Sequence, residues 1–529
     1  MSKRKRDREA DKAPNVVNDG ASQPLKATAK LQSQNQDVSS PFIKPQTSKS
    51  STNNANGGLK TSNASTQQLK SAATPKPTKI PRTENHIDVK TELPVIQIVT
   101  GSYERTLHGI NAKLSLNDGK LKSTYTDSFL FNAHQSAVRC LALSPMPEES
   151  DQGVYLATGG SDERVNIYSL SAAPVPDTDR KGRKVPTMPT FGPNQISENP
   201  LNRELGTLVQ HSSSITALHF PSRSKLLSAS EDNTISVTRV RDLEVISTVK
   251  APRPKVSGQA SGDSASAGTI PSGVNDFAIH PSMKLMVSVG RGEKCMRLWN
   301  LVTGKKAGVL NFERDILQAV KEGKYSHGEG RKIRWNHSGT EFSVAFERGV
   351  VVFGQDSKPR CVLMPSTLTK VHQLVYFRTG KDHEFLACST DDGKILFFDT
   401  VKASTATKDL PVLNPIAYTG GEKHGITKRI KDFQILDLTK HGFPGRLIIA
   451  GCSNGDISLL SLKDDEILKP DTDGGFVGTA SADVYSTGNR VTCLVAFAML
   501  PALDIEGGLS EAESVLGSEI ESDDSSDNE

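Results

Sequence analysis

The feature that most constrains the fold is a unit of short apolar strands and tight turns that recurs along the middle of the chain. In each copy, a His or a polar turn leads into an apolar strand. A second strand, a Ser/Gly/Asp turn and a third apolar strand follow. Such units cannot bury an apolar face alone, so several copies must stack on one another. No long stretch has the 3.6-residue period of an amphipathic helix, and the sequence therefore predicts an all-β fold.

Six copies of the unit can be traced. The clearest begins at His134 and reaches its turn at Asp162, and the second begins at His211 and reaches its turn at Asp232. Four further copies begin their first strands at Val274, Ile333, Val371 and Ile430.

The two ends of this region supply a seventh unit. Residues 94–110 read as a unit without its first strand, and residues 490–497 read as a first strand with nothing after it. Pairing the two would protect two exposed strand edges. We therefore predict a ring that is closed by its own last strand.

The repeated residues resemble the WD40 repeat, a four-stranded blade of about 40–45 residues. The resemblance covers roughly residues 92–501 and implies a seven-bladed β-propeller that serves as a binding platform. It also implies that a turn Asp bonds nearby backbone N–H groups, while a His and a strand Ser or Thr complete a buried polar network. Several blades lack the His or the Asp, and Trp299 alone fills the position where the repeat has a strand Trp. The expected structural residues are His134, Asp162, His211, Asp232, Trp299 and Asp392.

The segments outside and between the repeats are polar. Residues 1–91 are basic and rich in Ser, Thr, Asn, Gln, Lys and Pro, and residues 502–529 contain many acidic residues without Lys or Arg. Neither segment can bury enough apolar surface to offset its ordering entropy, so both are predicted to be disordered tails. Polar insertions near residues 172–203, 252–272, 312–329 and 402–424 are predicted to be surface loops.

Cysteine usage and the start of the chain favour an intracellular, soluble protein. The six cysteines include no Cys-x-x-Cys pair and no His at zinc-ligand spacing, which indicates buried thiols in a reducing compartment. The charged start lacks the apolar segment of a signal peptide, and the longest mainly apolar run, residues 491–500, is shorter than the ~20 residues of a membrane helix.

The sequence contains no P-loop, Gly-x-Ser-x-Gly elbow, His-Glu-x-x-His motif or close carboxylate pair with an obvious base. The Gly-Arg-Gly at residues 290–292 is too short to cradle a phosphate. We therefore expect no catalytic residue, cofactor, metal, membrane contact or small-molecule substrate.

One position in the repeat carries a charge pattern. The residue before the leading Val or Ile of each first strand lies, in this repeat, at the top entrance of the central channel. Three copies have Ala137, Ser214 and Gly273 there, and the next four have basic residues. With one neighbouring Lys these residues should form a positive arc that attracts an acidic peptide or a phosphate backbone, unless they are merely the Lys and Arg common in exposed loops. The basic arc consists of Lys332, Lys370, Lys428, Arg429 and Arg490.

The charged ends of the chain suggest partners that bind through electrostatic attraction. The run Lys3, Arg4, Lys5 and Arg6 matches a nuclear-localisation or nucleic-acid-binding segment, with a solvated charge run as the alternative. The acidic end could mimic nucleic-acid charge, bind a basic protein or aid solubility, and its serines among acidic residues could be phosphorylated.

The order of several segments resembles one WD40 family. These segments are residues 98–105, residues 133–134 leading into 156–163, residues 211–216, and residues 286–290 leading into 297–301. Together they resemble the family that contains the fungal maintenance-of-killer protein eleven and the animal PAK-interacting protein. This resemblance implies a nucleolar factor in assembly of the large (60S) ribosomal subunit, beside ribosomal-protein-like factors on the precursor particle. Animal relatives are also described as negative regulators of a PAK kinase.

Three hypotheses follow. The first is a non-catalytic scaffold in nucleolar 60S assembly, with pre-60S proteins, foremost a ribosomal-protein-like factor, and rRNA as candidate partners. The second is a signalling adaptor that binds and restrains a PAK-type kinase. The third is a propeller hydrolase that would use His134 or His211.

Overall fold

The computed structural model describes residues 93–117, 120–148, 153–174, 199–254, 272–323, 326–380, 383–402, 410–468, 475–478 and 483–501. The two predicted tails lie outside these ranges, as do Lys3 to Arg6. No helix within these ranges is long and apolar enough to cross a membrane.

The described strands form seven sheets, which we call blades 1 to 7. The strands of each blade are given from the inner edge outward. Blade 1 contains β29 (Val491–Ala498), β1 (Val95–Ser102), β2 (Thr106–Asn117) and β3 (Lys120–Asn132). Blade 2 contains β4 (Val138–Leu143), β5 (Val154–Gly160), β6 (Val165–Leu170) and β7 (Arg203–Leu208). Blade 3 contains β8 (Ile215–Ser222), β9 (Lys225–Ser230), β10 (Thr234–Arg239) and β11 (Val245–Lys250).

The remaining blades follow in chain order. Blade 4 contains β12 (Val274–Ile279), β13 (Leu285–Gly290), β14 (Cys295–Asn300) and β15 (Lys305–Asn311). Blade 5 contains β16 (Lys332–Trp335), β17 (Glu341–Ala345), β18 (Val350–Gly354), β19 (Pro359–Leu363) and β23 (Val412–Leu413). Blade 6 contains β20 (Val371–Thr379), β21 (His383–Thr390), β22 (Lys394–Phe398) and β24 (Ala417–Gly420). Blade 7 contains β25 (Ile430–Asp437), β26 (Arg446–Cys452), β27 (Asp456–Leu462) and β28 (Asp483–Ser486).

Short helices connect some of these strands. They are α1 (Arg314–Ala319), α2 (Asp464–Leu468) and the 3₁₀ turns η1 (Thr400–Lys402), η2 (Glu422–His424) and η3 (Thr439–His441). Each inner strand contacts the inner strands of the blades on either side, in the order β29, β4, β8, β12, β16, β20, β25 and back to β29. The fold is therefore a closed seven-bladed propeller, and the predicted fold class is confirmed.

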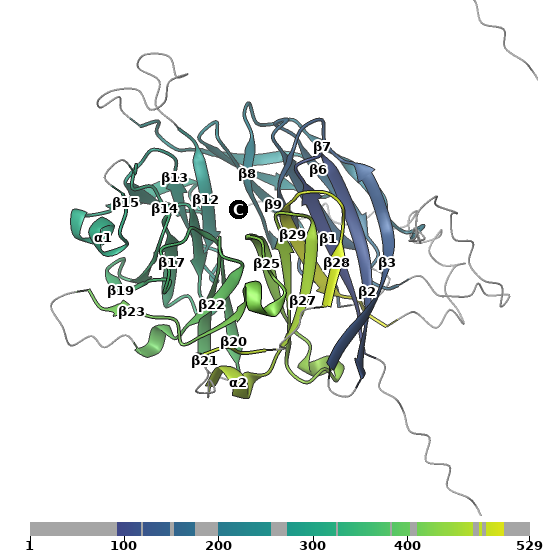
Figure 1. Ribbon diagram of the computed structural model, residues 1–529. Coiled ribbons are helices and arrows are strands. Elements are labelled where there is room, and N and C mark those ends of the chain that lie inside the picture. The colour runs from purple at the N-terminus through teal and green to yellow at the C-terminus, as the bar shows by residue number, and fades with distance from the viewer. Residues whose placement is uncertain are drawn as a thin grey trace, which may run out of the picture. The chain divides into compact units, whose positions relative to one another are not determined.

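The last strand closes the ring. β29 pairs antiparallel with β1, so that Ile96 lies opposite Ala498 and Thr100 lies opposite Leu494 (Figure 1). In Figure 1 the yellow β29 runs beside the blue β1, although the two strands come from opposite ends of the propeller sequence. The edges of β29 and β1 that face each other are thereby paired, as the sequence predicted.

Apolar side chains from adjacent blades form the core. Ile96 and Ile98 of blade 1 are fully buried in one cluster with Leu447 and Ile449 of blade 7. Every residue of β18 is buried, because blade 5 is covered on both faces by its neighbours. Burial of each such side chain contributes about 1.5–3 kcal/mol, so blade-to-blade packing is a main source of stability.

Polar side chains on the inner strands also join neighbouring blades. A hydroxyl, carboxylate or amide of one inner strand bonds the inner strand of the next blade. The bonds are Thr492 Oγ1 to the Val138 carbonyl (2.6 Å), Thr216 Oγ1 to the Val274 carbonyl (2.6 Å), the Ile333 N–H to Asp276 (3.1 Å), Gln373 Nε2 to Asp432 (2.9 Å) and the Leu494 N–H to Asp432 (3.0 Å). These bonds fix the blades around the central channel.

The structure corrects the prediction that the insertions near 312–329 and 402–424 are only surface loops. The first contains α1, whose Ile316 is buried together with Val320. These residues are four apart and so lie on the same helical face, but six helical residues are too few to show a period in the sequence. The second contains β24, the outer strand of blade 6. Residues 255–271, within the insertion near 252–272, lie outside the described ranges.

Candidate functional site

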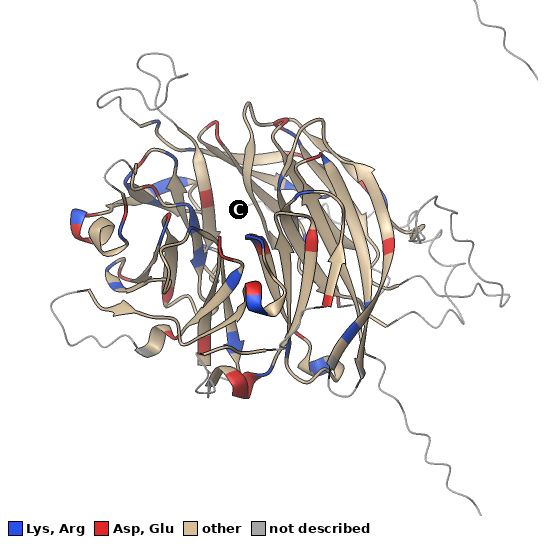
Figure 2. Ribbon diagram, viewed as in Figure 1, with Lys and Arg blue, Asp and Glu red and all other residues tan. Residues whose placement is uncertain are grey.

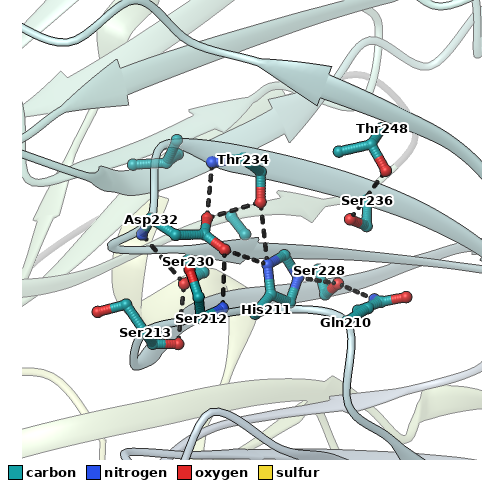
Figure 3. A network of polar contacts seen from close by, with 12 residues as sticks. Gln210, His211, Ser212, Ser213, Ser228, Ser230, Asp232, Thr234, Ser236 and Thr248 are labelled. Atoms are coloured by element: carbon teal, nitrogen blue, oxygen red, sulfur yellow. Dashed lines mark hydrogen bonds and ion pairs between the residues drawn. The ribbon is translucent and has the colours of Figure 1, made fainter.

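The turn Asp of blade 3 is the centre of a polar network (Figure 3). His211 Nε2 lies 2.8 Å from Ser228 Oγ, and its Nδ1 lies 3.1 Å from Asp232 Oδ2. Asp232 also accepts backbone N–H bonds from Ser212 at 3.2 Å and from Thr234 at 2.8 Å. Burial alone would raise the pKa of Asp232, but these hydrogen bonds outweigh it and hold the pKa far below its usual value. The carboxylate thus stays ionised and ties strand and turn together.

Blade 2 repeats this arrangement. His134 Nε2 lies 2.8 Å from Thr158 Oγ1, and its Nδ1 lies 2.9 Å from Asp162 Oδ1. Asp162 accepts the Gln135 backbone N–H at 2.9 Å. Burial lowers the pKa of His134 more than Asp162 raises it. Both ring nitrogens of this His, like those of His211, therefore have partners within the fold.

The other two expected structural residues have simpler surroundings. Trp299 Nε1 donates to Ser288 Oγ at 2.8 Å in the core. Asp392 accepts hydroxyl bonds from Thr390 and Thr367 and lies 3.5 Å from Lys394 Nζ, and among the described residues no His contacts this carboxylate.

The residue that follows each turn Asp has a positive φ. The angles are 67° at Glu163, 68° at Asn233 and 76° at Gly393. This left-handed conformation costs energy for residues other than Gly and Asn. The backbone N–H bonds to the preceding Asp offset that cost and hold the hairpin in shape.

The structure distributes the basic arc over the top face, which we define as the face where the inner strands begin. Lys332 lines the central cavity, of about 780 Å³, and Arg490 lines a second cavity of about 590 Å³. Lys370, Lys428 and Arg429 are exposed and line neither cavity. The structure thus brings two of the five arc residues to the cavities and leaves three on the outer rim.

Acidic residues partly balance the arc. Lys370 Nζ lies 2.8 Å from Glu347, and Arg429 lies 3.9 Å from Asp391. Acidic and basic residues are interspersed over the propeller (Figure 2). Charge on the top face must therefore be judged pair by pair rather than by counting Lys and Arg.

A ring of polar residues at the channel was not predicted from the sequence. The residue directly after the leading Val or Ile of each inner strand lines the central cavity in all seven blades. This pattern could have been found, because every one of these positions is polar while the preceding position is apolar. The channel ring consists of Thr492, Arg139, Thr216, Asn275, Arg334, His372 and Lys431.

Most charges of the channel are paired. Arg334 lies 2.7 Å from the buried Asp276. Glu231 lies 3.1 Å from Arg291 and 3.7 Å from Arg139. Lys431 is the cation of the channel ring that has no ion pair or side-chain hydrogen bond in the described part of the chain.

Titratable groups in and near the channel are perturbed by burial. Burial, then Arg334, lowers the pKa of His219 to about 4, so its imidazole is neutral at pH 7. Burial raises the pKa of Asp432, against hydrogen bonds from Gln373 and the Leu494 N–H. Burial likewise raises the pKa of the Cys140 thiol to about 12, and all six cysteines are unpaired. Within the described ranges no group of three or more His, Cys, Asp or Glu side chains could hold a metal ion. Lys431, which has no ion pair within the described residues, is available to an anionic group that enters the channel.

Comparison with known proteins gives a consistent result. The family model described as "WD domain, G-beta repeat" matches residues 125–169 and 202–238. Protein MAK11 of Saccharomyces cerevisiae is 26% identical over 425 residues, which cover 75% of this chain and 82% of that protein. The p21-activated protein kinase-interacting protein 1-like of Gallus gallus is 25% identical over 303 residues, 57% of this chain and 60% of that protein. Shk1 kinase-binding protein 15 of Schizosaccharomyces pombe is 24% identical over 323 residues, 60% of this chain and 73% of that protein.

Proposed function

Given that this chain is a WD40-repeat propeller similar to MAK11 and to the kinase-interacting proteins, we propose that it is a non-catalytic scaffold in assembly of the large (60S) ribosomal subunit. It would act in the nucleus and nucleolus. Its partners would be proteins of the pre-60S particle, foremost a ribosomal-protein-like assembly factor, with rRNA as a further candidate. No catalytic group, cofactor or small-molecule substrate enters this proposal.

The observation that carries the proposal is the basic top face of a rigid ring. Lys332 and Arg490 line the two cavities there, while Lys370 and Arg429 stand at the rim. Cations at the mouth of a low-dielectric channel attract the phosphates or carboxylates of a partner. Because hydrogen bonds and apolar packing fix the blades, these side chains are presented at constant spacing.

Sedimentation of the tagged chain from nuclear extract tests this function. We expect co-migration with RNase-sensitive precursor particles. The variant K332E/K370E/R429E/R490E should leave the particles, while K305E/K306E, which changes two exposed lysines on β15, should remain. Circular dichroism and thermal melting would verify that both variants fold. A chain that never co-migrates with particles would refute the proposal, and particle binding that survives the fourfold change would remove the basic arc from it.

A kinase adaptor is the second candidate, because kinase binding stands in the names of the Gallus gallus and Schizosaccharomyces pombe proteins. The chain spans three fifths of the first of these and more than four fifths of MAK11, which favours assembly. An RNase-insensitive free pool that carries a PAK-type kinase, and changes the activity of that kinase, would favour the adaptor instead.

We also propose that the basic run at the start of the chain directs it to the nucleus. The fourfold alanine variant at Lys3, Arg4, Lys5 and Arg6 removes four positive charges from this segment. Fluorescence microscopy should then show the tagged chain in the cytoplasm. Unchanged nuclear fluorescence would contradict this role.

A further inference from the structure

Two cavities meet at one point of the top face. The second cavity lies between blades 1 and 2, and Arg139, Lys431 and Thr492 line both it and the central cavity. Arg105 and Arg490 line the second cavity as well. We call the set Arg105, Arg139, Lys431 and Arg490 the channel mouth.

The channel mouth has more cationic side chains than carboxylates that pair with them. Within the described residues, Arg105 and Lys431 have no ion pair, and the guanidinium of Arg490 lies 5.5 Å from the ring centre of Tyr103. The ion pair of Arg139 is the 3.7 Å contact with Glu231. The carboxylate of Glu104 accepts the Arg490 backbone N–H at 2.9 Å. An added anion would therefore find cations that the fold leaves available.

Lys431 is a half-buried member of the channel mouth with several cations close by. Burial lowers its pKa, and repulsion from Arg429, Arg490 and Lys370 lowers the pKa further, while Asp391 acts in the opposite direction. An ammonium that is half-buried and faces three other cations is stabilised when an anion enters beside it.

The position of Lys431 favours a peptide carboxylate over a phosphate backbone. Lys431 is the second residue of β25 and lies two residues beyond the exposed rim cation Arg429, on the cavity side of it. A Glu or Asp side chain on an extended segment can reach into the cavity, whereas a polynucleotide backbone would meet the rim cations first.

We propose that the channel mouth is a binding site for an Asp/Glu-rich peptide segment, and that its occupant is the acidic segment of this same chain, residues 502–529. The inference deepens the proposed function and rests on it for its role, since the occupant would compete with the partner for the top face. The acidic segment thereby sets how readily the scaffold binds its partner.

The charge and the length of residues 502–529 are compatible with binding at the channel mouth. Residues 502–529 contain ten Asp or Glu and no Lys or Arg. They follow Pro501, a few residues beyond the far end of β29, whose eight residues rise about 27 Å from the top face. A segment of 28 residues can span roughly 90 Å when extended, at ~3.3 Å per residue. A tethered segment of this length has an effective concentration on the order of millimolar, so it competes well with a free ligand.

Titration of the full chain with a fluorescein-labelled peptide of residues 509–529, followed by fluorescence anisotropy, tests the inference. The tail-neutral variant carries Gln at 506, 511, 513, 519, 521 and 529 and Asn at 504, 523, 524 and 527 in place of the native Glu and Asp. It should bind the peptide about tenfold more tightly than the native chain, because its own segment no longer competes.

Substitution of Lys431 then locates the site. In the tail-neutral background, Lys431→Gln should weaken peptide binding about tenfold, as expected for loss of one charge-assisted hydrogen bond. The matched control Lys306→Gln changes an exposed lysine on β15 and should have no effect. If Lys431→Gln fails to fold, the exposed Arg105→Gln serves in its place.

Three results would overturn the inference. They are equal peptide affinity of the native and tail-neutral chains, peptide affinity that is unchanged by Lys431→Gln, and a 20-nucleotide uridine RNA that displaces the peptide and binds more tightly than the peptide does. The titration uses purified chain, so failure of particle association in the sedimentation experiment leaves its outcome unchanged. Failure of the inference and failure of the proposed function can therefore be told apart.

Discussion

Removal of the turn carboxylate in blade 3 tests how far the polar networks stabilise the propeller. In Asp232→Ala, four hydrogen bonds disappear, from His211 Nδ1, the Ser212 N–H, the Thr234 N–H and the Thr234 hydroxyl. Ser212 is exposed, so water replaces its bond at little cost. The buried His211 and the partly buried Thr234 cannot be rehydrated as easily.

The expected loss follows from these contacts. The three remaining hydrogen bonds to the charged group, which water does not readily replace, cost roughly 1.5 kcal/mol each, so Asp232→Ala should lower the free energy of unfolding by about 4.5 kcal/mol. Asp232→Asn keeps one acceptor and should lose less. Asp242→Ala, in the exposed turn before β11 of the same blade, is the control and should leave stability unchanged.

Equilibrium unfolding in urea, followed by circular dichroism, measures these differences. The pKa of Asp232 is lowered in the folded chain, so its contribution is present above the unfolded pKa, about 3.9, and is lost as pH falls through the folded pKa. The gap between native chain and Asp232→Ala should thus be full at pH 7 and smaller at pH 3. Equal stability of the two proteins at pH 7 would refute the reasoning.

Two further substitutions probe buried polar groups. Trp299→Phe leaves the buried Ser288 hydroxyl without its indole donor and should cost about 1 kcal/mol in urea unfolding, while a loss below measurement error would show that this bond contributes nothing. Burial raises the pKa of Glu341, although hydrogen bonds from Thr400 and Arg360 oppose the shift. Because the folded chain holds the proton more tightly than the unfolded chain, the free energy of unfolding falls as pH rises from the unfolded pKa through the folded pKa. The stability of Glu341→Gln relative to the native chain should therefore increase between pH 4 and pH 7, and the opposite trend would mean that the ion pair with Arg360 outweighs burial.

The blades could be predicted because their signals are local. The segment from His134 to Asp162 contains its own strand pattern, its turn Asp and its His, so the sequence predicts the contacts that the structure contains. Ring closure could also be predicted, since residues 94–110 and 490–497 are each incomplete without the other.

The channel ring could not be found from the charge of the rim alone. The basic arc follows the position before the leading residue of each inner strand, and Lys431 is two residues further along β25. Residues two apart on a strand lie on the same side of the sheet, so the polar position after the leading residue faces the channel on the same side as the basic arc. Which of these side chains lack partners depends on distances that no sequence pattern gives.

A contact between neighbouring blades whose residues are far apart in the sequence also could not be predicted. His108 lies 2.9 Å from Asp127, which in turn accepts the hydroxyl of Tyr485 at 2.5 Å, although Asp127 and Tyr485 are 358 positions apart. α1 was missed for a different reason, because its six residues give too short a pattern to distinguish a helix from a polar loop.

The claim on which everything else depends is that β29 closes the ring against β1, and a cross-link tests it most directly. Val99 lies opposite Val495 in this pairing, so V99C/V495C should form a disulfide under mild oxidation, mapped by mass spectrometry. V99C/A496C is out of register by one residue, which turns the second thiol to the other face, and should not cross-link. Cross-linking of the in-register pair alone is the predicted result; absence of that disulfide, or equal yields from both pairs, would contradict the closed propeller.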